Sequence, residues 1–355
     1  MKLLRQVPKI LFGAGAFDSL GEAVSTLKNS GYAVYIIDAV HAKTGLVNKL
    51  PLVGNDYSLS VDTTDEPTTD GVDALRDEIK KRSDKLPAVI VGVGGGSTLD
   101  IAKAVSVVLT NPGSSRDYQG WELVKNAPIP KVGVPTLSGT GSEATRTAVL
   151  TSPGKKFGIN SPYSLFDLVV LDPLLARTVP AEQQFYTGMD CYIHCVESIN
   201  GSFKDKLITV YVQAGLAMCR DIFLKGGEPS DQDRENLMIA SYFGGLSIAN
   251  SEVGVCHALS YGLSLELKFH HGLANCIAFN QLEEYYPNEV SDFKEMLERN
   301  NIVLPKNVTQ AVSAEQMESM IAMTLLMEKP LTNALGPDWK NVFPREKILQ
   351  LYARM

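Results

Sequence analysis

The first half of the chain alternates short apolar runs with amphipathic stretches and glycine-rich turns. Apolar runs of about four to six residues are typical of strands that are buried on both faces. The stretch Asp70–Arg82, which places Val72, Leu75 and Ile79 on one side, predicts a helix. Because strands and helices alternate, we expect a mostly parallel sheet covered by helices. The predicted strands are Lys9–Phe12, Ala33–Asp38, Tyr57–Val61, Ala88–Val93, Lys131–Pro135 and Leu168–Leu171.

Two features mark the end of this α/β pattern. Residues 154–163 have the pattern of a hairpin, which we expect to extend the sheet. From about residue 181 onward the apolar positions follow helical periods, interrupted by breakers such as Gly226-Gly227. The sequence therefore predicts two domains, an α/β domain over residues 1–176 and an all-helical domain over residues 177–355.

The composition is typical of a soluble globular protein and argues against some partners. Of the 355 residues, 45% are hydrophobic and 21% are charged, so the chain can bury a sizeable core. A formal net charge of −7 argues against a nucleic-acid or anionic-membrane surface, since both need a basic footprint. No apolar run is long enough to span a membrane, and Arg5, Pro8 and Lys9 interrupt the N-terminus before a signal sequence could form. We expect a cytoplasmic protein.

A glycine-rich segment follows the fourth predicted strand. Gly94, Gly95 and Gly96 are consecutive, and a helical pattern begins at Ser97. Such glycines let backbone N–H groups approach a phosphate closely, and the helix N-terminus adds the positive end of its dipole. Ser97 and Asp100 also have the spacing of a capping box, so a purely structural helix start is the alternative. The position between strand and helix favours phosphate binding.

Two further features indicate a dinucleotide. Asp38 ends a predicted strand, where a carboxylate can bond an adenosine ribose and repel a 2′-phosphate, so we expect NAD rather than NADP. A simple strand cap is the alternative for this residue. The loop Pro135–Thr145 offers hydroxyl and N–H groups to a cofactor directly after a strand. The glycines do not have the G-x-G-x-x-G spacing after the first strand, so the sequence predicts a nucleotide-binding fold other than the usual Rossmann module.

A candidate metal site lies in the second half of the chain. Four of the five histidines lie between residues 190 and 280. Asp190 and His194 are four residues apart, which on a helix places both side chains on one face. His257 and His271 follow, and one carboxylate with three imidazoles suits Zn²⁺ or Fe²⁺ better than Mg²⁺ or Ca²⁺. Histidines that serve only the core or the surface are the alternative.

The cysteines are rival ligands, because Cys191, Cys195 and Cys256 each adjoin a candidate ligand. A neighbouring residue on a helix points about 100° away, so if Asp190 and His194 face an ion, the cysteines beside them face other helices. The chain has five cysteines, an odd number, in apolar surroundings. We therefore expect all of them to be free, buried thiols.

The motifs together resemble the iron-containing (group III) alcohol dehydrogenases. The resemblance is carried by GGGSTLDIAK, PTLSGTGSEAT, DPLL, GMDCYIHCVES and the spacing of His257 and His271, and it runs along nearly the whole chain. It implies an N-terminal NAD-binding domain, a C-terminal helical metal-binding domain and a homodimer. It implies cofactor contacts from Asp38, Gly94, Gly95, Gly96, Ser97, Asp100, Thr136, Thr140, Ser142 and Lys156, and metal ligands at Asp190, His194, His257 and His271.

The resemblance also implies a reaction. A primary alcohol of a sugar or polyol would give a hydride to NAD and become an aldehyde, while one divalent ion, Zn²⁺ or Fe²⁺, holds the hydroxyl oxygen. The chain as a whole resembles members that act on C8 of 3-deoxy-D-manno-octulosonate (Kdo), a lipopolysaccharide sugar, and a general short-chain alcohol or polyol is the alternative. A substrate with a carboxylate needs a cation, for which Arg146, Lys156 and Lys268 are candidates.

Two positions depart from the family pattern. Phe166 stands where members have a proline just before the predicted strand at 168–171, and the other departure is at a proposed proton carrier. Members usually have a histidine four residues after the third ligand, thought to relay a proton, whereas this chain has Tyr261. A phenol is a poorer base than an imidazole, so His270, beside a ligand, is an alternative proton carrier. Two other functions stay open: a dehydroquinate-synthase-like lyase, which normally uses a glutamate with two histidines, and a metal- or nucleotide-binding protein without catalysis.

Overall fold

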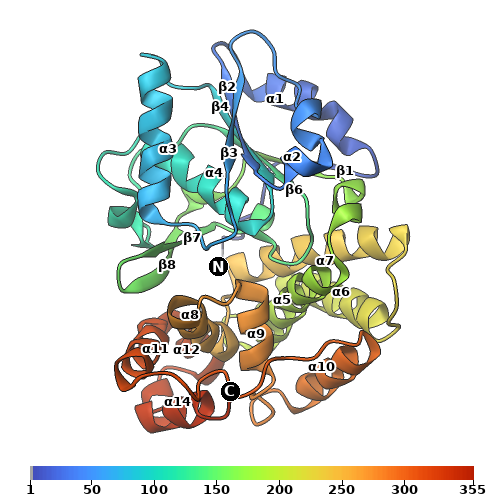
Figure 1. The fold of residues 1–355 in the computed structure, drawn as a ribbon, viewed down its shortest axis with the longest axis vertical. Coiled ribbons are helices and arrows are strands. Elements are labelled where there is room, and N and C mark those ends of the chain that lie inside the picture. The colour runs from blue at the N-terminus through green and yellow to red at the C-terminus, as the bar shows by residue number, and fades with distance from the viewer. Residues whose placement is uncertain (1–2) are drawn as a thin grey trace. The chain divides into compact units, whose positions relative to one another are not determined.

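A computed structural model describes residues 3–355, which form two compact units (Figure 1). The first unit contains the chain up to Leu137 together with Ser142–Thr178. The second contains Val179–Met355 and the short segment Ser138–Gly141. The division after Thr178 lies two residues beyond the predicted boundary, and the segment Ser138–Gly141 was not expected to leave the α/β half.

The first unit is built on a six-stranded parallel sheet, as the apolar runs predict. Its strands follow the order β1-β9-β6-β4-β2-β3. They are β1 (Ile10–Phe12), β2 (Ala33–Asp38), β3 (Tyr57–Val61), β4 (Val89–Gly94), β6 (Lys131–Pro135) and β9 (Leu168–Leu171). The first and fourth strands begin one residue later than predicted, and β4 runs into the glycine-rich segment.

Helices cover both faces of this sheet, which explains why its inner strands are mostly apolar (Figure 1). Alternate residues of β2 belong to different hydrophobic cores. Val34 and Ile36 lie in the core beneath α3 and α4, and Tyr35 and Ile37 lie in the core beneath α1. The helices of this unit are α1 (Leu20–Leu27), α2 (His41–Thr44), α3 (Thr69–Arg82) and α4 (Gly96–Val108). The predicted α/β fold class is confirmed for the first half of the chain.

The predicted hairpin exists, but it belongs to a separate sheet. Its strands β7 (Thr147–Ser152) and β8 (Lys155–Asn160) pair antiparallel, and β8 also pairs with β5 (Gly120–Trp121). The expectation that the hairpin extends the main sheet is therefore wrong. The periodicity of a strand shows which faces are buried and does not show which neighbour it pairs with.

The second unit is helical, as predicted. Its first helix, α5, is buried continuously from Gln184 to Ser198, so its polar side chains need partners inside the protein. The helices are α5 (Ala181–Asn200), α6 (Lys206–Phe223), α7 (Asp231–Asn250), α8 (Val255–Leu267), α9 (His271–Phe279), α10 (Pro287–Arg299), α11 (Ala314–Leu326), α12 (Glu328–Leu335), α13 (Trp339–Val342) and α14 (Arg345–Tyr352).

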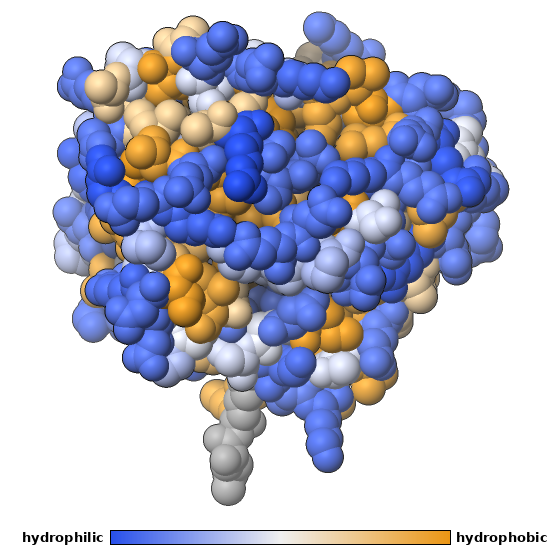
Figure 2. Space-filling view, turned by 90° about the horizontal axis from the view of Figure 1, so that it is seen from below, coloured by the Kyte–Doolittle hydropathy of each residue, from blue (hydrophilic) through white to orange (hydrophobic). Residues whose placement is uncertain are grey.

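The helix starts of this unit are well specified by capping side chains. Asp205 accepts hydrogen bonds from Leu207 N and Ile208 N at the start of α6, and Ser230 and Ser313 form capping boxes at α7 and α11. None of the helices described over residues 3–355 is long and apolar enough to cross a membrane. Figure 2 shows one face of the molecule, on which hydrophilic side chains surround separate hydrophobic patches.

Candidate metal centre and nucleotide-binding loops

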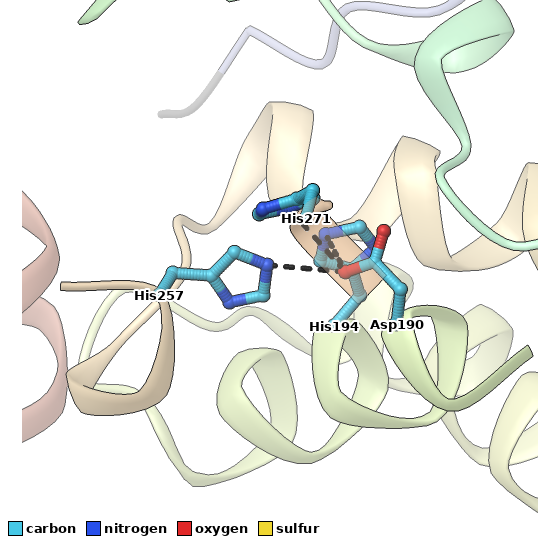
Figure 3. A group of neighbouring side chains, drawn as sticks. All are labelled: Asp190, His194, His257 and His271. Carbon is cyan, nitrogen blue, oxygen red and sulfur yellow. Dashed lines mark ion pairs between the residues drawn. The ribbon is translucent and has the colours of Figure 1, made fainter. Parts of the chain in front are cut away.

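Three helices of the second unit bring the four predicted metal ligands together (Figure 3). Asp190 and His194 lie one turn apart on α5, as the four-residue spacing predicts. His257 is the third residue of α8, and His271 is the first residue of α9. Asp190, His194 and His257 are buried, and His271 is partly exposed, so the cluster can be reached from one side.

The distances in this cluster fit a single four-coordinate ion. Asp190 Oδ1 lies 3.4 Å from His194 Nε2, 3.3 Å from His257 Nε2 and 3.6 Å from His271 Nε2. The four ligand atoms all lie within 4.8 Å of one another. In a tetrahedral site with bonds of about 2.0–2.1 Å to nitrogen and oxygen, neighbouring ligand atoms are about 3.3–3.4 Å apart. The distances from Asp190 are close to this spacing, so the four residues could hold one divalent cation through Oδ1 of Asp190 and the three Nε2 atoms.

Burial and mutual attraction shift the pKa values of this cluster. Burial alone would raise the pKa of Asp190, but the imidazoles of His194, His271 and His257 together lower it well below its usual range. Burial lowers the pKa of His194 to about 4. Burial also acts to lower the pKa of His257, but the carboxylates of Glu197 and Asp190 outweigh it and raise that pKa to about 9. A cation that binds here must compete with protons for these groups.

Two polar residues at the cluster were not predicted from the sequence. Glu197 Oε2 accepts a hydrogen bond from His257 Nδ1 at 2.6 Å. Asn275 Nδ2 donates to Asp190 Oδ1 at 2.7 Å and lies 3.3 Å from His257 Nε2 and 3.2 Å from His271 Nε2. Helical spacing is the signal that could have found both: Glu197 lies seven residues after Asp190, and Asn275 lies four after His271.

The five cysteines are free and buried, as predicted. Cys191 Sγ and Cys219 Sγ are 3.6 Å apart, so the thiol beside Asp190 points to α6. Cys256 Sγ donates to the carbonyl oxygen of Asn275 at 3.3 Å. Within residues 3–355, the group of side chains spaced to hold a metal contains no cysteine.

Tyr261 and His270, the two candidate proton carriers, differ in exposure. Tyr261 is buried on α8, and its ring centroid is 5.7 Å from that of His271 in an edge-to-face arrangement. His270 is exposed and precedes α9 as its N-cap residue. Tyr261 is therefore the one in ring contact with a candidate ligand.

The glycine-rich segment of the first unit joins β4 directly to α4. Gly95 is the N-cap residue of α4, and no side chain caps the helix, so the predicted Ser97–Asp100 capping box is wrong. Asp100 is instead buried, where it accepts hydrogen bonds from Ser142 Oγ at 2.6 Å and from Val149 N at 2.9 Å. The N-cap residue of α4 is thus a glycine, which has no side chain of its own to bond the first N–H groups, a helix start that suits an anion.

Gly94 is required by the packing of this turn. A Cβ atom at Gly94 would lie 2.5 Å from Thr98 Oγ1, which no side chain tolerates. The small residue lets α4 start close against the end of β4, and this packing supplies a structural reason for the glycine besides phosphate binding.

Asp38 lies at the end of β2, as predicted. Its Oδ2 accepts from Thr63 Oγ1 at 2.6 Å, and its Oδ1 accepts from Val40 N at 3.0 Å. Nearby in the same unit, Thr136 Oγ1 is 3.0 Å from His41 Nε2. These contacts orient the carboxylate and the hydroxyl that the sequence assigns to the cofactor.

The remaining predicted residues lie in different surroundings. Lys156, assigned to the cofactor, is buried and pairs with Glu66 Oε1 at 2.9 Å.

Ser142 belongs to the first unit, whereas Thr140 lies in the short segment that packs with the helical unit. There, Gly139 N donates to Ser241 Oγ at 2.9 Å. A Cβ atom at Gly139 would lie 1.8 Å from Thr187 O, so this loop meets α5 too closely for any side chain.

The candidate cations for a substrate carboxylate also have partners. Arg146 Nη1 pairs with Glu122 Oε1 at 2.6 Å in the first unit. Lys268 is exposed in the second unit, between α8 and α9, and its Nζ donates to Leu265 O at 2.7 Å. Lys268 thus lies in the connection that joins the helices of His257 and His271.

Comparison with known proteins agrees with this fold. The family model described as iron-containing alcohol dehydrogenase matches residues 8–173. The model of the C-terminal part of the Fe-containing alcohol dehydrogenase family matches residues 184–334. These two matches define the class as an iron-containing alcohol dehydrogenase.

Individual relatives support the assignment. The chain is 34% identical over 294 residues to a sulfoacetaldehyde reductase from Bilophila wadsworthia, covering 79% of this chain and 74% of the relative. It is 30% identical over 312 residues to a 1,3-propanediol dehydrogenase from Citrobacter freundii, covering 83% and 79%. A crystal structure of a 1,3-propanediol oxidoreductase has the same fold, with a TM-score of 0.86, 23% identity and 99% of each chain covered. The chain belongs to the iron-containing alcohol dehydrogenase family and is an oxidoreductase.

Proposed function

We propose that the protein interconverts a primary alcohol and its aldehyde, with NAD as the hydride carrier and a divalent cation held by Asp190, His194, His257 and His271. The observation that carries the proposal is this largely buried cluster, whose four ligand atoms lie close enough together to share one divalent cation. In the oxidation, the carbinol C–H bond breaks, its hydride goes to NAD⁺, and the hydroxyl proton leaves to a base. The products are an aldehyde, NADH and a proton.

The chain's own residues supply the charge and the shape of the centre. When bound, a divalent cation supplies Lewis acidity that lowers the pKa of the alcohol. Asp190 contributes the negative ligand, and the three imidazoles contribute neutral nitrogen ligands. Both Zn²⁺ and Fe²⁺ suit this donor set.

We assign the NAD contacts to the α/β unit and the adjoining loop. The open N-terminus of α4 at Gly95, Gly96 and Ser97 offers N–H groups to the pyrophosphate. Asp38, at the end of β2, is placed to accept from ribose hydroxyls and to repel a 2′-phosphate, which favours NAD over NADP. Thr136, Thr140, Ser142 and Lys156 are the further proposed contacts, and the hydrogen-bond and ion-pair partners of Ser142 and Lys156 suit them to supporting the loop.

The substrate is proposed to be a terminal alcohol of a sugar or polyol. The names of the relatives, sulfoacetaldehyde reductase, 1,3-propanediol dehydrogenase and NAD-dependent methanol dehydrogenase, share a primary alcohol or its aldehyde. Within that class we propose C8 of Kdo, because the chain as a whole resembles Kdo 8-oxidase and C8 is a primary alcohol. A general short-chain alcohol or polyol is the second candidate.

The proton that leaves the hydroxyl group is proposed to pass through Tyr261 or His270. Tyr261 is in ring contact with His271, and His270 is exposed next to it. Tyr261 is the stronger candidate for the first step because it is buried beside the cluster, and His270 can complete the transfer to water. We further propose that the enzyme works in the cytoplasm as a homodimer.

A panel of alcohols tests the function. Purified protein is given NAD⁺ with Zn²⁺ or Fe²⁺, and the absorbance of NADH is followed with Kdo, polyols and short alcohols. We expect NADH with at least one primary alcohol and the highest kcat/KM with Kdo. If no alcohol yields NADH with either metal, the dehydrogenase proposal is wrong. NADH from other primary alcohols but not from Kdo would refute only the Kdo assignment.

A further inference from the structure

Glu197 is a buried carboxylate that the four-ligand set does not use. It lies on α5 with Asp190 and His194, and the spacing places all three side chains on one face of the helix. The residue is 1% exposed, and in the described part of the chain its ion-pair partner is His257. Burying a carboxylate away from water is costly unless it is paired and hydrogen-bonded, so its partners explain why it can stay there.

Three N–H groups at the start of α8 donate to this carboxylate. Gly254 N donates to Oε2 at 2.8 Å, and Cys256 N donates to Oε1 at 2.6 Å. His257 Nδ1 donates to Oε2 at 2.6 Å. Gly254 is the N-cap residue of α8, so one carboxylate both caps the helix and holds the ring of the candidate ligand that the helix carries.

The bond to Nδ1 determines how His257 can act. A carboxylate only accepts, so the shared proton belongs to Nδ1 of the ring, which leaves Nε2 as the nitrogen that can bind a cation. Nε2 is the atom that lies 3.3 Å from Asp190 Oδ1 in the cluster. The hydrogen bond made by one ring nitrogen sets which nitrogen binds a metal, and its carboxylate partner raises the basicity of the ligand.

Glu197 also completes the charge balance of the centre. Imidazoles are neutral when they bind a cation, so Asp190 and Glu197 supply the negative charge around the four ligands. Two carboxylates balance one divalent cation, whereas Asp190 alone would leave a net positive charge in a buried site.

We propose that Glu197 is a positioning residue of the metal centre, which orients His257 for binding through Nε2 and balances the second charge of a divalent cation. This inference rests on the proposed metal site and is independent of the substrate. The competing account is that Glu197 only caps α8. In that case, removing its charge would leave the metal affinity unchanged.

Metal affinity in the full-length protein separates the two accounts. Glu197→Gln keeps the size of the side chain and removes its charge. We expect the dissociation constant for Zn²⁺, measured by competition with a chromophoric chelator, to rise about 10- to 100-fold. The matched control is Glu252→Gln, the same change in the segment before α8, where the carboxylate lies 3.7 Å from Lys329 Nζ. We expect the control to bind Zn²⁺ as the unmodified protein does.

A double-mutant cycle tests whether the effect passes through His257. In a His257→Ala background, Glu197→Gln should cost less Zn²⁺ affinity than it does alone, because the ring it orients is gone. Fully additive losses would overturn the proposal. A Glu197→Gln protein that is less stable after chelation but binds Zn²⁺ normally would overturn it too, and would leave only the helix cap. If Glu197→Gln does not fold, Glu197→Asp is measured instead, with the same expected and contradicting outcomes.

The two proposals fail in different ways. If Glu197→Gln weakens Zn²⁺ binding and the unmodified protein oxidises no alcohol, the proposed reaction fails and the role of Glu197 stands. If the alcohol panel yields NADH and Glu197→Gln binds Zn²⁺ normally, the reaction stands and the role of Glu197 fails.

Discussion

Asn275 donates a hydrogen bond from Nδ2 to Asp190 Oδ1, at 2.7 Å, and so links α9 to α5. This oxygen is the one that faces the three imidazole nitrogens, so the amide holds the carboxylate in its ligating orientation. Asn275 is fully buried, and water does not replace the bond if the amide is removed.

We therefore expect Asn275→Leu to weaken Zn²⁺ binding about tenfold or more, measured by chelator competition. Asn111→Leu is the control, because Asn111 is a buried asparagine of the α/β unit that bonds Val107 O and the backbone of Asn126. Each variant should lose about 1–3 kcal/mol of stability in the chelated state. Equal Zn²⁺ affinity in both variants would show that Asn275 is only structural.

Metal removal should lower stability through the four-ligand cluster. Ions that bind only the folded state stabilise it by about 2.7 kcal/mol when the free ion is 100 times its dissociation constant. We expect the unfolding midpoint of chelated protein to rise when Zn²⁺ is added, and His194→Ala to abolish most of that rise. The control is His41→Ala, which removes a buried histidine of the other unit. In this variant the Zn²⁺-dependent rise of the unfolding midpoint should persist. A metal-dependent shift that survives in His194→Ala would contradict the ligand assignment.

Cofactor preference should depend on Asp38. Removing its carboxylate takes away the repulsion of a 2′-phosphate, so Asp38→Ser should raise kcat/KM for NADP⁺ about tenfold or more relative to NAD⁺. Asp62→Ser is the matched control, since Asp62 follows the neighbouring strand β3 and is exposed. Steady-state rates with both cofactors measure the ratio. An unchanged ratio in Asp38→Ser would indicate that Asp38 is a strand cap.

The proton route should respond to Tyr261. Imidazole ordinarily titrates near pH 6.5 and phenol near pH 10, so Tyr261→His places a base of lower pKa beside His271. We expect the rise of kcat/KM with pH in alcohol oxidation, which reports deprotonation of the base, to move to lower pH. Tyr261→Phe should lower kcat and leave Zn²⁺ affinity unchanged. If the Tyr261→Phe enzyme has an unaltered kcat, Tyr261 is not the proton carrier and His270 becomes the candidate.

Much of the fold could be predicted because its signals are local. The runs of β2, β6 and β9 coincide with the predicted strands, since a strand buried on both faces is mostly apolar. The edge strand β3, whose residues alternate in the sequence YSLSV, also coincides with its prediction. The four candidate ligands could be chosen because histidine is rare in this chain and the Asp190–His194 spacing matches one helical turn.

What could not be predicted depends on contacts between distant residues. Ser97 and Asp100 have capping-box spacing, but Asp100 is drawn into a buried network with Lys103 and Ser142. The partner of Lys156, Glu66, lies far away in the sequence. Glu197 has helical spacing with Asp190 and His194, but its role shows only in its contacts with the start of α8, 57 to 60 residues further along the chain.

A metal titration tests the central claim most directly. Chelated protein is titrated with Zn²⁺ or Fe²⁺ while bound metal and NADH formation from a primary alcohol are measured in the same sample. The account predicts that the rate rises in proportion to bound metal, stops at one ion per chain, and is lost together with the ion in His257→Ala. Alcohol oxidation by fully chelated protein, or undiminished metal content in His257→Ala, would contradict it.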